Sequence, residues 1–299
     1  MTKSNNGLCA ALGAFLIWGL LPLYWKTISS AIPLEILCHR ITWSTVATLL
    51  ILALWGKTGK LIPVLKDRKV VIRFMVTSLL LSSNWLIYIW AVNSNFIVES
   101  SLGYFINPLI NVLLGMIFLK ERLRPPQWLA MFMAFSGVCY LTFGYGHFPW
   151  IAIALALTFA FYGLLRKTAP LPSLEGLCLE TSILFIPALV TMIFLAMQGN
   201  LDFIHQNTSG RLLLAGTGIV TSLPLLLFGY AAQKIRLSTL GVIQYIGPSM
   251  QLCIGIFVYG ESFPKEQMIG YALVWCGLLI YATEGIMVRF YRDKSCLKK

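Results

Sequence analysis

The chain consists almost entirely of long apolar segments separated by short polar breaks. Ten such segments can be read from the sequence, at residues 7–26, 33–54, 72–92, 98–119, 126–144, 148–166, 177–197, 212–232, 238–259 and 267–288. Each is close to the roughly 20 residues that a helix needs to cross a bilayer. Their apolar residues run continuously rather than alternating with polar ones, unlike the strands of an outer-membrane barrel. The pattern therefore predicts an all-α integral membrane protein with ten transmembrane helices.

Composition and charge narrow the class of protein. Of the 299 residues 58% are hydrophobic and 11% are charged, against about 45–50% and about 25% in soluble domains. A soluble enzyme is thereby excluded. The net charge of +12 would suggest a nucleic-acid partner in a soluble chain. Here the longest stretch outside the predicted helices, about residues 55 to 71, is too short for such a module, so we expect its basic residues to contact lipid headgroups and no nucleic acid to bind.

The positions of the basic residues predict the orientation in the membrane. With the N-terminus in the cytoplasm, 19 of the 23 Lys and Arg residues fall on the cytoplasmic side. Lys26, Arg211 and Lys265 lie outside, and Arg40 falls within a helix. Cytoplasmic loops of membrane proteins carry such an excess of basic residues. Losing or adding one helix would invert every later loop, so the asymmetry predicts an even number of crossings and two cytoplasmic termini.

The two halves of the chain resemble each other. A shift of 140 residues places Ile106, Pro108, Gly115, Glu121, Gln127 and Gly137 on Ile246, Pro248, Gly255, Glu261, Gln267 and Gly277, and it places Leu34, Glu35, Leu37 and Cys38 on Leu174, Glu175, Leu177 and Cys178. A shift of 144 places Phe15, Gly19, Leu20 and Leu21 on Phe159, Gly163, Leu164 and Leu165. The chain thus divides into two repeats, residues 7–144 and 148–288, each with five predicted helices.

Five is an odd number, so the second repeat begins on the opposite side of the membrane from the first. Inverted repeats are typical of secondary transporters, because two inverted copies can exchange conformations around a site at the midplane and so give alternating access. The alternative is a gene duplication that only doubled a helical bundle.

Polar residues follow one face of the fourth predicted helix and of its repeat counterpart, the ninth. They are Ser100, Tyr104, Pro108 and Asn111 in the first, with Asn107 beside them, and Gln244, Pro248 and Gln251 in the second. A proline removes a backbone hydrogen bond and can bend a helix, which is tolerated at membrane depth against protein or a water-filled cavity. Side-chain amides can donate to and accept from a polar solute. The stripes predict a cavity lining, with interhelical hydrogen bonding as the alternative.

Aromatic residues accompany these stripes. Asn84, Trp85 and Tyr88 lie deep in the third predicted helix, and Trp18, Phe161 and Tyr162 belong to the first and sixth. Together with Tyr245 they could form an aromatic pocket for a flat or cationic solute, through stacking and cation–π contact. Taken singly, each could instead face lipid or pack in the core.

Three ionisable residues fall inside predicted helices: His39, Arg40 and Glu180. A charge at the centre of a membrane helix costs about 2.5–3.5 kcal/mol on insertion scales and usually has a function. The 140 shift makes Glu180 the counterpart of Arg40, on the opposite side of the midplane. Glu35 lies one turn before His39 and could influence its protonation. We hypothesise that Glu180 or His39 takes up and releases a proton, while Arg40 holds the substrate or a gating carboxylate; a purely structural polar network is the alternative.

Longer motifs resemble those of a known family. They are His39-Arg40, residues 84–93 (NWLIYIWAVN), residues 99–108 (ESSLGYFINP), residues 161–164 (FYGL) with Arg166-Lys167, Glu180-Thr181, and residues 236–241 (RLSTLG) with 244–248 (QYIGP). In these motifs and in its two repeats the chain resembles the drug/metabolite transporter superfamily, its EamA-type members and among them the RarD-type permeases.

The resemblance implies a multi-pass permease of the bacterial inner membrane with ten helices. Its cavity would be lined by the first four helices of each repeat, and the fifth and tenth would be peripheral. The link of the RarD type to chloramphenicol sensitivity suggests a drug or another small organic molecule. The wider superfamily moves amino acids, nucleosides, amines or sugar phosphates, so the expected partner is a small polar metabolite or drug-like solute.

Other classes of function leave weaker traces in the sequence. It contains no HExxH, no GxSxG and no zinc-ligand spacing of Cys and His, so we expect no metal, no cofactor and no enzymatic activity. A membrane-embedded enzyme is therefore the weaker alternative, whereas a passive facilitator would share every feature above. Gly137 and Gly277 could support a homodimer or pack within one chain.

Overall fold

The computed structural model describes residues 3–28, 31–94, 96–143, 148–260 and 265–296. In these ranges the regular elements are helices: α1 (Lys3–Thr27), α2 (Pro33–Leu54), η1 (Thr58–Lys60), α3 (Leu61–Lys66), α4 (Arg68–Asn93), α5 (Ile97–Leu119), α6 (Pro125–Phe143), α7 (Trp150–Lys167), α8 (Ser173–Met197), α9 (Asp202–His205), α10 (Thr208–Lys234), α11 (Leu237–Gln244), α12 (Ile246–Phe257) and α13 (Lys265–Cys296). The predicted all-α class is confirmed.

Nine segments of the described chain are long and apolar enough to cross a membrane. They coincide with nine of the ten predicted helices, and α11 and α12 together form one of them, Leu237–Phe257. Helix α6 is not among the nine, because it opens with the polar sequence Pro125-Pro126-Gln127, which lowers its mean hydropathy. The last residue of the predicted fifth segment, 144, lies outside the described residues.

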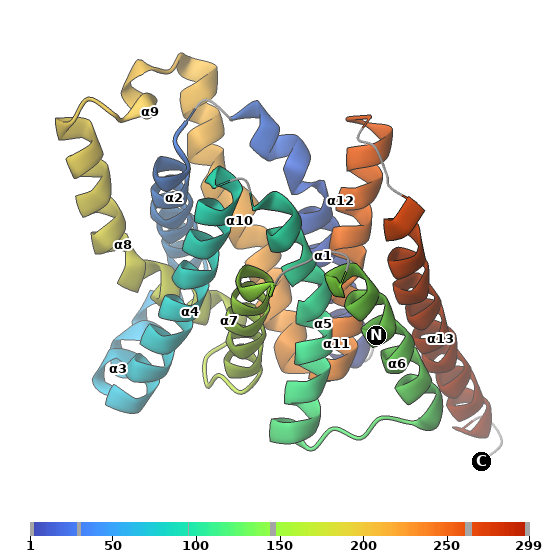
Figure 1. The fold of residues 1–299 in the computed structure, drawn as a ribbon. Helices are drawn as coiled ribbons and strands as arrows, with labels where there is room; N and C mark the ends of the chain where they lie inside the picture. Colours follow the sequence, from blue (N-terminus) through green and yellow to red (C-terminus); the bar gives the residue numbers. More distant parts are fainter. Residues whose placement is uncertain (1–2, 29–30, 95, 144–147, 261–264, 297–299) are drawn as a thin grey trace.

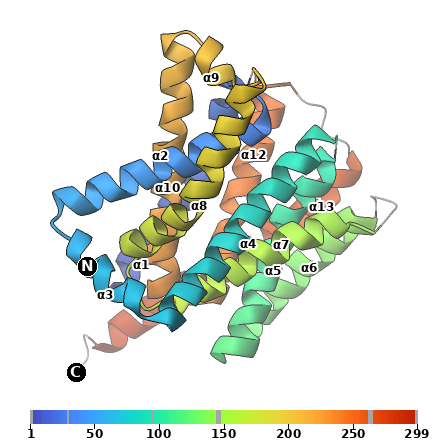
Figure 2. The ribbon, with the colours of Figure 1, turned by 90° about the vertical axis from the view of Figure 1, so that its left-hand side faces the viewer.

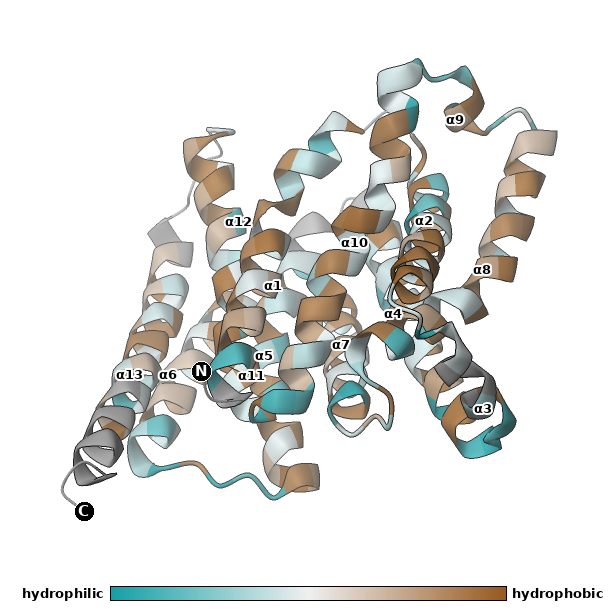
Figure 3. Ribbon diagram, turned by 180° about the vertical axis from the view of Figure 1, so that it is seen from behind, coloured by the Kyte–Doolittle hydropathy of each residue, from teal (hydrophilic) through white to brown (hydrophobic). Residues whose placement is uncertain are grey.

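The helices pack in a bundle in which the two halves of the chain interleave (Figure 1). Helix α1 packs against α10 and α12, α2 against α8 and α10, α4 against α7 and α8, and α5 against α7 and α11. Figure 2 shows α4 running alongside α7. At one end lies α9, and at the other lie α3 and the connection between α5 and α6, which Figure 3 colours as hydrophilic.

Large apolar side chains cover much of the outer surface. Leu79, Ile117, Phe132, Ile186 and Ile219 are each more than 60% exposed. A water-soluble protein rarely leaves so much apolar surface uncovered, whereas hydrocarbon chains can cover it at no cost. The distribution fits a multi-pass membrane protein.

Helices α6 and α13 form a pair at one edge of the bundle (Figure 1). A Cβ atom added at Gly137 would lie 2.5 Å from the carbonyl oxygen of Gly270, and one added at Gly277 would lie 2.6 Å from that of Ala130. These glycines let the two backbones approach closely. The small-residue stripes that could have supported a dimer are therefore used within the chain.

The two stripe prolines affect their helices differently. Helix α5 runs unbroken through Pro108, whereas the regular helix is interrupted between α11 and α12 at Tyr245, three residues before Pro248, although the backbone angles of Tyr245 stay helical. Pro248 has no N–H to donate to the Gln244 carbonyl, so the turn before it lacks one helical hydrogen bond. The break places the end of α11 and the start of α12 at the centre of the bundle.

Candidate functional site

A cavity of about 340 Å³ lies between the two halves of the chain. This volume falls in the range of about 300–1,000 Å³ that is usual for small-molecule sites. Helices α1, α2, α4 and α5 of the first half and α7, α10, α11 and α12 of the second contribute its lining. Among the described residues, α6 and α13 contribute none, as the family resemblance implies for the fifth and tenth helices.

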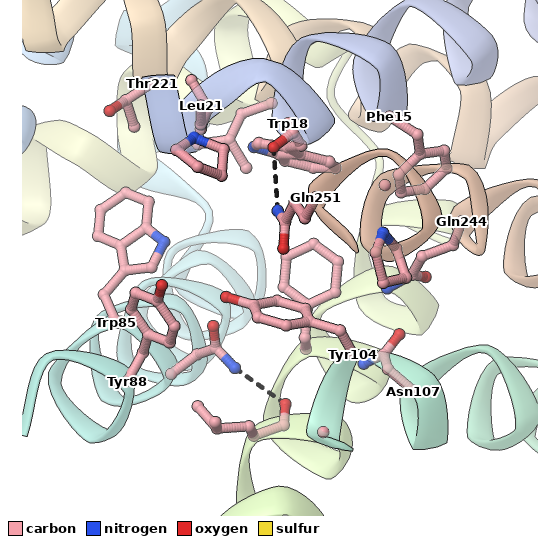
Figure 4. A pocket seen from close by; sticks show the side chains of 18 of the residues that line it. Phe15, Trp18, Leu21, Trp85, Tyr88, Tyr104, Asn107, Thr221, Gln244 and Gln251 are labelled. Carbon is pink, nitrogen blue, oxygen red and sulfur yellow. Dashed lines mark hydrogen bonds between the residues drawn. The ribbon is translucent and has the colours of Figure 1, made fainter. Parts of the chain in front are cut away.

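Many of the residues singled out in the sequence meet at this cavity (Figure 4). Those that line it are Trp18, Arg40, Asn84, Trp85, Tyr88, Tyr104, Asn107, Gln244, Pro248 and Gln251. Those that lie elsewhere are His39, Pro108, Asn111, Tyr162, Glu180 and Tyr245. The lining also includes Phe15, Trp25, Phe159 and Thr221, which no sequence pattern singled out as site residues.

Aromatic rings form much of the wall. Trp18 lies 5.5 Å from Phe15 and 5.7 Å from Phe159, measured between ring centroids. Tyr88 and Tyr104 meet edge to face at 5.9 Å. Such tilted and edge-on contacts are favourable for aromatic pairs. They hold the wall in one shape and offer ring surfaces on which a flat solute can pack.

Three amide side chains of the lining are held by backbone carbonyls of neighbouring helices. Gln251 donates from Nε2 to the Trp18 carbonyl at 3.1 Å, Asn84 donates from Nδ2 to the Leu155 carbonyl at 2.9 Å, and Asn107 donates from Nδ2 to the Ala156 carbonyl at 2.7 Å. Figure 4 shows the first of these bonds, between Gln251 and Trp18. Because the nitrogens are used in this way, the amide oxygens of Asn84 and Gln251 remain available as acceptors.

Asn111 lies behind the lining rather than in it. Its Nδ2 donates to Oδ1 of Asn107 at 3.0 Å and to Oε1 of Gln244 at 2.9 Å. Asn111 is fully buried. It therefore orients two lining amides, one from each half of the chain, and its predicted place in the cavity wall is wrong for this conformation. The helical spacing identified its face of α5 but not its depth.

Arg40 lines the cavity from the N-terminal half of α2. Its Nε donates to the hydroxyl of Thr221 on α10 at 3.0 Å. Its guanidinium carbon lies 4.3 Å from the ring centroid of Trp85 and 5.0 Å from that of Trp25, so both indoles make cation–π contacts with it. Two helices and two rings thus fix the position of this charge.

Glu180 lies in a different and fully buried cluster. Its Oε1 is 3.7 Å from Nη1 of Arg166, and its Oε2 accepts a hydrogen bond of 3.2 Å from the Tyr162 hydroxyl. Neither Glu180 nor Tyr162 lines the cavity. Arg166 is also fully buried. The sequence assigned it to the cytoplasmic face because it stands beside Lys167 at the end of a predicted helix, which is where positive-inside residues normally lie.

His39 belongs to a contact network in the N-terminal part of α2. Its Nε2 is 3.5 Å from the Glu35 carboxylate, its Nδ1 accepts a bond of 3.2 Å from the Trp43 indole, and its ring packs 4.8 Å from that of Phe203. Glu35 also accepts from the backbone N–H groups of Asp202 and Phe203, at 2.9 and 2.8 Å. The predicted contact between Glu35 and His39 is present. Glu35 holds α9 in place through its two backbone hydrogen bonds, and neither residue lines the cavity.

Two further aromatic residues lie apart from the cavity. Tyr245 is 1% exposed and packs against Phe105 with ring centroids 6.3 Å apart. Phe161 points away and is 36% exposed. Both stand within two residues of positions that do line the cavity, Gln244 and Phe159. Successive residues of an α-helix are rotated by about 100° around its axis, so these neighbours in the sequence point to different sides of the helix.

Comparisons with known proteins agree with this architecture. The model of the EamA-like transporter family matches residues 5–143 and again residues 149–283. The chain is 42% identical to the protein RarD of Streptomyces exfoliatus over 287 residues, which cover 95% of this chain and 90% of that one. It is 41% identical to an uncharacterized transporter of Vibrio cholerae over 283 residues, covering 95% and 94%.

A solved crystal structure shares the fold. It is 18% identical in sequence, has a TM-score of 0.68, and the match covers 93% of this chain and 97% of that one. The apolar helices, the central cavity and the two family matches, together with relatives of about 40% identity over nearly the full length, lead to one conclusion. The chain belongs to the EamA-like transporter family as a multi-pass membrane transporter of the RarD-like type.

Proposed function

We propose that the chain is a secondary transporter that carries a small metabolite or drug-like solute across the bacterial inner membrane by alternating access. The observation that carries the proposal is a relation between the two repeats. Residues that line the cavity have repeat counterparts that are buried, and residues at its centre have counterparts that line it as well.

The packing of the helices supports inverted repeats. If each helix is exchanged for its counterpart in the other half, the contact of α1 with α10 becomes that of α7 with α4, and the contact of α1 with α12 becomes that of α7 with α5. The contact of α2 with α10 likewise becomes that of α8 with α4. Three further pairs, α2 with α8, α5 with α11 and α6 with α13, map onto themselves. Such a pattern is expected of two halves related by an axis in the membrane plane.

Four counterpart pairs differ in their access to the cavity. The lining residues Trp18, Arg40, Gln251 and Pro248 correspond through the shifts of 144 and 140 to Tyr162, Glu180, Asn111 and Pro108, which are buried. In the opposite conformation the two repeats would exchange roles. The second set would then line a cavity open to the cytoplasm, and the first set would be buried.

Four other pairs line the cavity with both members. They are Phe15 with Phe159, Trp85 with Leu225, Tyr104 with Gln244, and Asn107 with Gly247. Residues near the axis between the repeats remain in the site in both conformations. A solute held there can therefore be passed from one side to the other, and the sequence prediction of a midplane site follows the same logic.

The conformation corresponds to an outward-facing state. The cavity is lined by the second half of α1, the end of α4 and the first half of α5, which are the outer parts of these helices in the predicted orientation. On the cytoplasmic side the ends are bonded together. Lys167 donates to the carbonyls of Ala232 and Ile235 at 3.2 and 2.5 Å, and Arg73 donates to that of Thr168 at 2.7 Å.

We propose that α6 also crosses the membrane, which brings the number of crossings to ten. It packs along α13, which is itself long and apolar enough to span, and α6 has 19 residues. Ten crossings keep both termini in the cytoplasm, as the distribution of basic residues requires. The polar start of α6 would then lie at the cytoplasmic interface rather than in the hydrocarbon.

Labelling of single cysteines tests alternating access. In a variant without the seven native cysteines, Gln251→Cys and Asn111→Cys form a matched pair of repeat counterparts, and Asn200→Cys in an exposed loop serves as the control for labelling from outside. A membrane-impermeant maleimide is added to right-side-out or inside-out vesicles. We expect Gln251→Cys to react from the outside and Asn111→Cys to react from the cytoplasmic side.

Equal reaction of both variants from the outside, or reaction of Asn111→Cys from neither side while solute is being transported, would contradict the exchange of roles. A passive facilitator is separated from a coupled transporter by a second measurement. Accumulation of solute in vesicles above its outside concentration requires coupling to a gradient, whereas equilibration alone favours the facilitator.

A further inference from the structure

We infer that the solute is an organic anion with a flat apolar body, and that Arg40 binds its carboxylate or an equivalent acidic group. The inference rests on the proposed transport function and adds the chemical class of the solute. It is carried by the surroundings of Arg40, which leave one positive charge in the cavity without a protein counter-ion.

Arg40 supplies the charge of the cavity. Of the described residues that line it, the others are aromatic, aliphatic, amide or hydroxyl side chains and glycines. In the described part of the chain the ion pairs join Glu35 to His39, Arg124 to Glu284, and Arg166 to Glu180. None of them involves Arg40. The cavity therefore carries a positive charge before a solute enters.

Arg166 shows how this chain treats an arginine that has a structural role. It is fully buried and lies within ion-pair distance of the Glu180 carboxylate. Arg40, by contrast, contacts a neutral hydroxyl and two neutral rings. These partners orient the guanidinium but do not neutralise it. A charge at membrane depth without a counter-ion is costly, and an anionic solute would remove that cost.

The geometry of the guanidinium suits a carboxylate. A guanidinium has five N–H donors, and the Nε donor is used by Thr221. Nη1 and Nη2 carry the other four donors. One N–H of each can form two parallel hydrogen bonds to the oxygens of a carboxylate. The guanidinium carbon lies over the indole rings of Trp25 and Trp85, and neither ring offers an acceptor oxygen that would occupy these four donors.

The other lining residues indicate the chemistry of the rest of the solute. Phe15, Trp18 and Phe159 offer ring surfaces, and the amide oxygens of Asn84 and Gln251 accept hydrogen bonds. A cavity of about 340 Å³ holds a molecule of one to a few rings. The sequence suggested a flat or a cationic solute. The position of Arg40 decides against the cation, because like charges repel strongly in a site of low dielectric constant.

The test lets the protein select its solute from a mixture. Purified protein is reconstituted into vesicles that have been loaded with an aqueous extract of bacterial metabolites, and mass spectrometry records which compounds leave faster than from protein-free vesicles. The variants are Arg40→Gln, Arg40→Lys and Arg211→Gln. Arg211 is the matched control, because it bonds the carbonyls of Phe203 and Ile204 away from the cavity.

We expect the compounds lost from wild-type vesicles to be organic acids. Arg40→Gln should slow their loss roughly 100-fold, because it removes a bidentate, charge-assisted contact. Arg211→Gln should behave as wild type. Arg40→Lys keeps the charge but loses the planar set of N–H donors that binds both carboxylate oxygens. It should therefore raise KM for the acid about tenfold with little change in kcat. If Arg40→Gln fails to insert, the Arg40→Lys result decides the question, and an unchanged KM would overturn the inference.

Two failures can be told apart. Loss of neutral or cationic compounds, or loss of acids at equal rates with wild type and Arg40→Gln, would overturn the anion inference while leaving the transporter in place. If no compound leaves faster than from protein-free vesicles, the proposed transport function fails and the inference fails with it. For an acid that is identified, its uncharged amide should show no measurable competition.

Discussion

The Glu121 carboxylate, just after α5, links the first half of the chain to the start of α11 in the second half. Helix α5 ends at Leu119, and Lys120 takes a left-handed conformation with φ of 53°, which turns Glu121 back toward the start of α11. There the Glu121 carboxylate accepts from the backbone N–H of Leu237 at 2.7 Å, from that of Ser238 at 2.9 Å and from the Ser238 hydroxyl at 2.6 Å. Opening toward the cytoplasm would separate these groups, so we predict that Glu121→Ala favours the inward-facing state.

The size of the effect follows from these contacts. A hydrogen bond to a charged group contributes about 1.5–3 kcal/mol net, and an acidic group at a helix N-terminus adds about 0.3–1 kcal/mol. Glu121 is half-buried, so water replaces part of the loss when the contact opens. Taking about 3 kcal/mol for the three bonds together, the ratio of inward to outward conformations should rise roughly 100-fold. Glu121→Gln keeps one acceptor oxygen and should give a smaller shift in the same direction.

The assay measures the rate at which maleimide labels Asn111→Cys from the cytoplasmic side. This rate is compared between the Asn111→Cys variant and the same variant carrying Glu121→Ala. When the inward state is rare, this rate is proportional to its population, so it should rise with the same factor until that state dominates. Labelling of Gln251→Cys from the outside should fall. Asp67→Ala is the matched control, because Asp67 accepts from the N–H of Lys69 at 2.9 Å and caps α4 without joining the two repeats.

The reasoning would be refuted if Glu121→Ala changed neither labelling rate, or if Asp67→Ala changed them as much. The first result would mean that the bonds to α11 persist in both conformations. The second would mean that any weakened helix start on this side opens the cavity. The repeat counterpart, Glu261, lies outside the described residues.

Three further predictions follow from the structure. If Glu180 takes up and releases the coupling proton, Glu180→Gln should make uptake in vesicles indifferent to a pH gradient; an undiminished response would show that Glu180 only fastens Arg166 and Tyr162. Asn111→Ala should weaken solute binding about tenfold, because Asn107 and Gln244 lose their common donor; unchanged thermal stabilisation by the solute would show that their orientation is set elsewhere. Gly137→Leu should destabilise the protein by about 1–3 kcal/mol in thermal unfolding through overlap with α13, whereas Gly285→Leu, with no atom within 4 Å of its Cβ position, should not.

The amino-acid sequence by itself determined the class of the protein and the course of the helices. Apolar runs of bilayer length have few alternatives to a helix, because every backbone N–H and C=O must be paired within the membrane. For this reason the predicted segments and the helices agree closely. The repeat offsets and the intramembrane charges could also be read directly, and Arg40 among them does line the cavity.

The tertiary structure decided which polar residues share a site. Arg166 looked like an ordinary positive-inside residue and proved to be the buried partner of Glu180. Asn111 lay on the expected face of α5, yet it sits one layer behind the lining. Gly137 and Gly277 turned out to serve the contact of α6 with α13. Helical periodicity gives the direction of a side chain from its own axis, but the neighbour in that direction depends on how distant helices pack.

The charge of the cavity was likewise decided by packing. The sequence placed Arg40 and Glu180 at matching positions of the two repeats, and nothing in it showed which of them would face the solute. In the folded chain one conformation exposes Arg40 between Trp25 and Trp85 and buries Glu180 against Arg166. Two positions that match in the sequence acquire different surroundings because α2 packs against α10 whereas α8 packs against α4, and such differences in packing arise only in three dimensions.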